Sequence, residues 1–154
     1  MPGIPQPAAG TSAEQRYQAL LEVTDAVALH DELDRLLHDL AQRLLKVVRF
    51  DSVSFVLHDP SANVMRVAHT ESFGQHLPLP ETVPIEGSAS GHVWHTGEPL
   101  VLDDLSQEQQ LGPVLKILQQ YGFQSCCVLP LTAADRRLGV LALTTWSGIP
   151  MCGV

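Results

Sequence analysis

Two of the seven histidines stand at a spacing that could hold a metal ion. His92 and His95 are three residues apart, so on a helix both side chains can face one ion or a haem iron. The surrounding residues 89–96 contain no Cys, Asp or Glu that would complete such a site. We therefore expect solvent-facing histidines with no bound metal or cofactor, and keep an iron or haem sensor as the less favoured hypothesis.

The cysteines offer a second kind of chemistry. Cys126 and Cys127 are adjacent, and neighbouring side chains of a strand point to opposite faces, so the two form neither a metal pair nor a ready disulfide. No basic residue in the same stretch would activate either thiol. With Cys152 they form an odd set, which favours packed thiols in a reducing cytoplasm over a redox sensor.

Catalytic motifs are absent from the sequence. Asp103 and Asp104 are consecutive at the end of a short apolar run, so their carboxylates splay apart instead of forming an acid–base pair. There is no Gly-x-Ser-x-Gly motif, no phosphate-binding glycine loop with lysine and no His-Glu-x-x-His motif. We therefore do not expect an enzyme.

The composition indicates one folded domain that binds neither membranes nor nucleic acids. Of the 154 residues 45% are apolar, and no apolar run approaches the ~20 residues of a membrane-spanning helix. The net charge is −8 and the nine Lys and Arg are scattered, so no basic face is available for phosphates. Residues 1–13 lack the pattern of a signal peptide, and their Pro and Gly predict a flexible lead-in.

Helical periodicity comes first in the chain and strand periodicity follows. Apolar side chains recur with a 3.6-residue period over residues 17–28 and 33–48, which predicts two amphipathic helices. From residue 51 onward the period is two, which predicts strands joined by short turns and hence an antiparallel sheet in an α+β fold. The other predicted elements are strands over residues 51–58, 64–70, 82–85, 98–102, 124–131 and 138–146, and helices over residues 89–96 and 108–121.

Several segments carry a resemblance to GAF domains. Residues 85–101 (IEGSASGHVWHTGEPLV) resemble the Gly-rich helix and "Gly-x-Pro-Leu-Val" strand of the family, and residues 103–104 match its acidic end. Residues 127–141 resemble its closing "Val-x-Pro-Leu … Leu-Gly-Val-Leu" hairpin. Residues 91–94 (GHVW) and 125–132 (SCCVLPLT) further resemble the N-terminal GAF domains of activators of the formate hydrogenlyase activator type, which are sigma-54-dependent. The resemblance covers residues 14–146.

This resemblance implies an antiparallel sheet of about six strands with the N-terminal helices on one face. A short helix and loops would roof the other face over a small-molecule cavity. By strand alternation we expect Val53, Phe55 and Leu57 to meet the helices. Ser54, His58 and His69 would then look toward the roofed side. The predicted ligand-binding residues are Ser54, His69, His92, Trp94 and Cys126.

The resemblance also implies a regulatory role. We expect a sensory module that binds a small-molecule effector and signals to an output domain, of the sigma-54 activator type, outside this chain. The alternative is a ligand-free dimerisation or protein-interaction module. Residues 147–154 are short and contain Gly and Pro, so this irregular tail cannot form the family's long last helix. We therefore expect a homodimer in which helices around residues 17–27 cover the surface left open.

Overall fold

The computed structural model describes residues 31–74, 76–108, 110 and 112–146. The chain divides into two compact units, Met1–Leu36 and Leu37–Val154. Residues 31–36 are the described part of the first unit, and they are helical. The expected lead-in over residues 1–13, the first predicted helix and the predicted tail over residues 147–154 lie outside the described residues.

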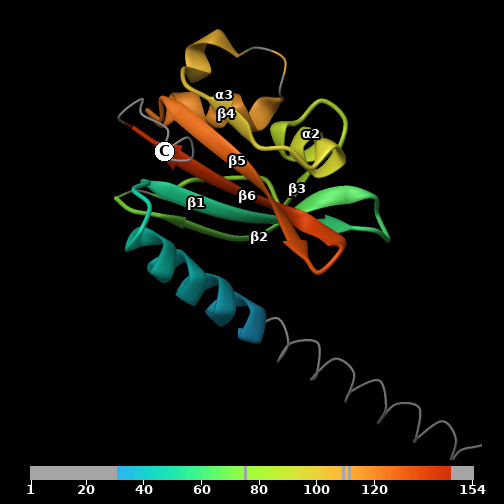
Figure 1. Cartoon of the computed structure of the whole chain (residues 1–154). Coiled ribbons are helices and arrows are strands. Elements are labelled where there is room, and N and C mark those ends of the chain that lie inside the picture. The colour runs from blue at the N-terminus through green and yellow to red at the C-terminus, as the bar shows by residue number, and fades with distance from the viewer. Residues whose placement is uncertain (1–30, 75, 109, 111, 147–154) are drawn as a thin grey trace, which may run out of the picture. The chain divides into compact units, whose positions relative to one another are not determined.

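The second unit is built on one six-stranded antiparallel sheet with the strand order β3-β2-β1-β6-β5-β4 (Figure 1). The predicted α+β class with about six antiparallel strands is therefore confirmed. Two hairpins, β1–β2 and β5–β6, are joined edge to edge by the pairing of β1 with β6. The strands are β1 (Ser52–Asp59), β2 (Val64–Ser72), β3 (Thr82–Val83), β4 (Leu100–Leu102), β5 (Ser125–Ala133) and β6 (Arg136–Thr145).

Helix α2 (Ala89–Thr96) has the predicted ends, and its sequence explains both of them. The Ser88 side chain caps its first turn by accepting a hydrogen bond from the Gly91 amide at 3.0 Å. Gly97 ends it in the left-handed conformation with φ of 74°, which costs glycine little. The helix packs on β5 and β6, so it covers one face of the sheet (Figure 1).

Helix α3 (Pro113–Gln120) begins later than the predicted residue 108. A proline inside a helix lacks the amide hydrogen and clashes with the preceding turn, but at the first position it is favourable. Pro113 therefore sets the start of α3, and a separate short 3-10 helix, η1 (Leu105–Gln107), precedes it. Within the described residues no helix is long and apolar enough to cross a membrane.

The helical residues 37–45 lie on the face of the sheet opposite α2 and α3 (Figure 1). Leu37 and Ala41, one turn apart, are buried, as the predicted stripe requires. Leu40 belongs to the same predicted stripe but is 40% exposed, and Val47 is 79% exposed. The fully buried part of the stripe is thus narrower than predicted, because it is limited to Leu37 and Ala41.

A β-bulge in β2 changes which side chains of this strand face the roof formed by α2 and α3. In the register with β1, Phe55 is opposite His69 and Val56 is opposite Val67, so Ala68 is an extra residue. One extra residue reverses the alternation of everything beyond it. The expectation that His69 looks toward the roofed face is therefore wrong. His69 and Glu71 lie on the opposite face, where they contact His38 of the helical residues 37–45.

Candidate ligand cavity

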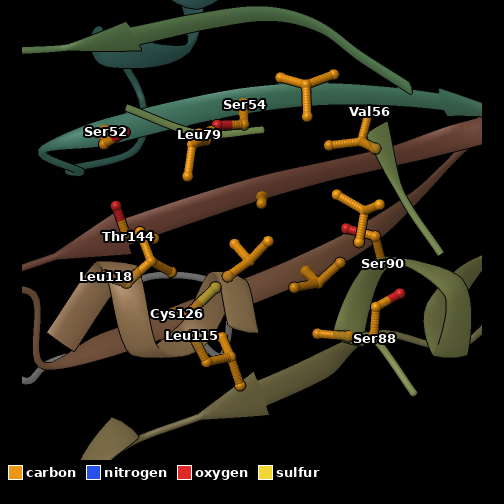
Figure 2. Close-up of a pocket in the computed structure, with 16 residues that line it drawn as sticks. Ser52, Ser54, Val56, Leu79, Ser88, Ser90, Leu115, Leu118, Cys126 and Thr144 are labelled. Carbon is orange, nitrogen blue, oxygen red and sulfur yellow. The ribbon is translucent and has the colours of Figure 1, made fainter. Parts of the chain in front are cut away.

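A cavity of about 40 Å³ lies between the sheet and the roof made by α2 and α3 (Figure 2). The central strands β1 and β6, together with β2, β3 and β5, supply its floor. Because these strands alternate, every second residue of β1 from Ser52 to Val56 faces it. Its aliphatic wall consists of Val56, Val67, Leu79, Val83, Ala89, Val114, Leu115, Leu118, Val128 and Ala142.

The polar side chains of the lining are all uncharged. Ser52 and Thr144 are opposite each other in the pairing of β1 with β6, and they lie at one end of the cavity (Figure 2). Ser88 and Ser90, from the start of α2, lie at the other end. Ser54 and Cys126 complete the set, and no Lys, Arg, His, Asp or Glu among the described residues lines the cavity.

The hydroxyls of the lining differ in whether they have hydrogen-bond partners within the protein. Ser54 Oγ lies 3.1 Å from Thr70 Oγ1, within hydrogen-bond distance. Ser88 Oγ donates to the carbonyl of Pro84 while it caps α2. Thr144 is 3% exposed, and its Oγ1 has no hydrogen-bond partner among the described residues. A buried hydroxyl without a partner costs about 1–3 kcal/mol, so Thr144 is the group that a bound molecule would satisfy.

Cys126 contributes an inert thiol to this cavity. It is a free, fully buried cysteine, and burial raises the pKa of its thiol to about 12. The side chain therefore stays protonated at neutral pH and is a poor nucleophile. Cys127 is disulfide-bonded, and because Cys126 is free the bond does not join these two neighbours, as expected. The expectation of a packed free thiol is wrong at Cys127.

The predicted site residues fall into two groups. Ser54 and Cys126 line the cavity, whereas His69 lies on the opposite face of the sheet. Trp94 of α2 is half-buried and stacks on His58 with ring centroids 4.0 Å apart, outside the lining. His92 is exposed and also lies outside the lining.

The His92–His95 pair gains no further ligand from the fold. Both side chains are exposed, and neither belongs to a group of three potential metal ligands in the described part of the chain. The haem or iron hypothesis therefore has no support from the geometry of α2.

Sequence reasoning missed Ser52, Ser88, Ser90 and Thr144. Ser52 could have been predicted, since it lies two residues before Ser54 in β1 and therefore faces the same side of the sheet. Thr144 could not have been predicted, because its place in the lining depends on the pairing of β1 with β6, two segments about ninety residues apart. The two serines of the α2 start line the cavity only because that helix end lies over the sheet.

Solved structures share this fold at low sequence identity. The GAF domain of a two-component sensor histidine kinase from Bacillus halodurans superimposes with a TM-score of 0.64 and 22% identity, covering 75% of this chain and 78% of that chain. A free methionine-R-sulfoxide reductase from Neisseria meningitidis, solved in complex with its substrate, gives a TM-score of 0.56 and 21% identity, with coverage of 70% and 59%. Likenesses at this identity establish the fold alone.

Curated relatives are regulators. The chain is 26% identical over 132 residues to the formate hydrogenlyase transcriptional activator of Salmonella typhimurium (strain SL1344), covering 82% of this chain and 19% of the relative. It is 30% identical over 132 residues to the DNA-binding transcriptional activator HyfR of Escherichia coli (strain K12), covering 82% and 20%. The chain thus spans about a fifth of the length of these relatives. The family model of the GAF domain matches residues 32–150, and the chain therefore belongs to the GAF domain family.

Proposed function

We propose that this GAF domain is a sensory module that binds a small polar molecule in the cavity under α2 and α3. The observation that carries the proposal is the buried Thr144 hydroxyl, which lines the cavity and has no partner among the described residues. Native proteins rarely leave such a group unsatisfied without a functional reason or a bound water. A ligand that hydrogen-bonds Thr144 would remove that cost.

The size and charge of the cavity restrict the ligand. A volume of about 40 Å³ restricts the ligand to a small molecule unless the roof opens. An ionised ligand would lose its hydration without gaining an opposite charge, because the described lining carries none. We therefore propose an uncharged ligand with a hydrogen-bonding group facing Thr144 and an apolar remainder against the aliphatic wall.

Signalling follows from the place of the cavity between two layers. The ligand would contact the sheet through Thr144 and the roof through Ala89 and Leu118. It shifts the equilibrium between arrangements of roof and sheet only to the extent that it binds one of them better. The relatives named as transcriptional activators support an output domain outside this chain. We propose that this output domain is of the sigma-54-dependent type and that the module acts in the cytoplasm, as the resemblance of residues 91–94 and 125–132 implies. The net charge of −8 argues against direct nucleic-acid contact by this module.

The lining supports regulation in preference to catalysis. General acid–base chemistry needs a titratable side chain at the reacting atoms, and the described lining offers only hydroxyls and one thiol. That thiol, Cys126, has a pKa raised to about 12 and is not poised to attack. The reductase named above shares the fold at 21% identity, and a shared fold alone does not imply that this chain has its activity.

A thermal-shift experiment tests the proposal. A ligand that binds only the folded state raises the melting temperature with its concentration, so we expect saturable shifts from small uncharged amides or alcohols. Acetamide and acetate form a matched pair of nearly equal shape, and acetamide should shift the transition while acetate should not. Thr144→Val should abolish the shift, whereas the exposed control Thr82→Val should retain it. An equal response in both variants would contradict the assignment of the site.

The alternative function is dimerisation or protein interaction without a ligand. The observation that favours it is two exposed apolar side chains, Leu40 of the helical residues 37–45, which lie on the face that lacks α2 and α3, and Val47 in the turn that follows them. We propose that a homodimer forms through this surface. If no compound of the thermal-shift screen stabilises the chain while self-association is strong, the interaction module is the better description. The two functions are compatible, because the cavity and this surface lie on opposite faces of the sheet.

A further inference from the structure

Three potential metal ligands meet on the face of the sheet opposite the cavity. His38 Nδ1 lies 3.0 Å from each carboxylate oxygen of Glu71, and His69 Nε2 lies 3.0 Å from Oε2 of the same carboxylate. The ligand atoms all lie within 4.8 Å of one another. No residue of this His38–His69–Glu71 cluster lines the cavity, so the cluster is independent of the proposed effector site.

The fold brings these residues together through two separate features. The bulge at Ala68 turns His69 and Glu71 toward the helical residues 37–45, although strict alternation would have placed them on the roofed face. Burial of Leu37, the neighbour of His38, fixes the side of that helix that meets β2. The three ligands therefore come from two elements, the helical residues 37–45 and strand β2.

Neighbouring side chains hold the ligands in place. The Phe55 ring packs against the His69 ring at a tilt of 45°, with centroids 6.3 Å apart. The rings of His38 and His69 are edge to face, with centroids 6.5 Å apart and planes at 80°. Gln42, one helical turn after His38, places its amide Nε2 3.5 Å from Glu71 Oε1. Such outer contacts orient metal ligands in known sites.

The donor set fits a transition-metal ion. Two imidazole nitrogens and one carboxylate suit Zn²⁺ and related divalent ions, and water would fill the remaining position. Ligand atoms about 2.0–2.2 Å from a tetrahedral ion are about 3.3–3.5 Å apart. The two His–Glu separations of 3.0 Å would open by a few tenths of an ångström, and the two imidazole nitrogens already lie within 4.8 Å of each other. We propose that His38, His69 and Glu71 bind a divalent first-row transition-metal ion that clamps the helical residues 37–45 to strand β2.

Access to the cluster is open on one side. The side chain of His38 is 53% exposed, whereas those of His69 and Glu71 are 19% and 15% exposed. An ion can therefore enter past His38 and retain a water ligand while the other two ligands stay partly shielded. Without an ion, the same three side chains form a hydrogen-bonded group around the Glu71 carboxylate. The experiment must separate these two states.

The test uses the full 154-residue chain without an affinity tag, freed of metal with a chelator, and titrated with Zn²⁺ by calorimetry. We expect one ion per chain, and a melting temperature that rises on Zn²⁺ addition and falls back with the chelator. His38→Ala, His69→Ala and Glu71→Gln should each weaken binding by more than about tenfold, and Gln42→Ala should weaken it less. Because His38 is exposed, His38→Ala should keep its fold in chelator.

The control variant is His92→Ala, which removes an exposed histidine outside the cluster and should bind Zn²⁺ like the parent. Substitution with Co²⁺ supplies a second readout, since a site of two histidines and a carboxylate gives visible bands without the charge-transfer absorption of a thiolate ligand. Absence of binding to the parent chain, or a thiolate band, would overturn the proposal. So would undiminished binding by His38→Ala. None of these outcomes depends on whether the cavity binds a ligand.

Discussion

Thr144 and Thr145 are neighbours in β6 whose buried hydroxyls differ in one respect. Thr145 Oγ1 hydrogen-bonds Ser125 Oγ, whereas Thr144 Oγ1 has no partner among the described residues. Thr144→Val should therefore raise the free energy of unfolding of the ligand-free chain by about 1 kcal/mol, since it removes an unsatisfied group. Thr145→Val should lower it by about 1–2 kcal/mol, because Ser125 is left unpaired. Urea unfolding measures the free energy of unfolding of both variants. A decrease in both would show that the Thr144 hydroxyl has a hydrogen-bond partner in solution.

Cys126 is the other residue for which burial decides the chemistry. Because its folded pKa is raised to about 12 from 9.0, the unfolded state releases the proton first. Its contribution to stability is present below pH 9 and is lost progressively as the pH rises toward 12. Alkylation at pH 8 should therefore be slow in the native chain and fast in urea. Cys126→Ala should lose stability less steeply than the parent between pH 9 and about 10.5; equal slopes would contradict this cause.

At the scale of elements, α2 depends on one glycine. A Cβ on Gly91 would lie 1.8 Å from the Ile85 carbonyl oxygen, so this helix sits directly on the preceding backbone. In an open helix Gly→Ala stabilises, but here it should cost about 2 kcal/mol or more by pushing α2 outward. His92→Ala, on the exposed side of the same helix, should change the free energy of unfolding by less than about 0.5 kcal/mol. Thermal unfolding of the two variants distinguishes the close contact of Gly91 with Ile85 from the effect of helix propensity. A Gly91→Ala variant more stable than the parent would contradict the close contact.

The elements also show what the sequence could predict. Capping by Ser88 and Gly97 and the alternation of β1 are local, and both were predictable. The bulge at Ala68 was not, because an extra residue appears only in the register between β1 and β2. That single residue moved His69 from the expected cavity to a different cluster. Local patterns thus predicted the fold and part of the lining, while the site residues that depend on pairing required the structure.

At the scale of the whole molecule, the exposed apolar surface decides self-association. Leu40, in the helical residues 37–45 opposite the roof, is 40% exposed, and Val47, in the turn that follows, is 79% exposed. The helix predicted over residues 17–28 lies outside the described residues. A two-fold contact is the commonest way for such a surface to be covered. We expect a homodimer in sedimentation equilibrium, with dissociation by Leu40→Glu because the interface would have to bury the new charge.

The matched control for this dimer is Leu138→Glu. Leu138 is 39% exposed, almost the same as Leu40, but it belongs to β6, close to the hairpin turn. The same substitution there adds the same charge without touching the proposed surface, so the chain should remain dimeric. Dissociation by Leu138→Glu alone would place the interface at the hairpin end. If the parent chain stays monomeric across a wide concentration range, Leu40 and Val47 are not buried by a second copy, and the proposed dimer is wrong.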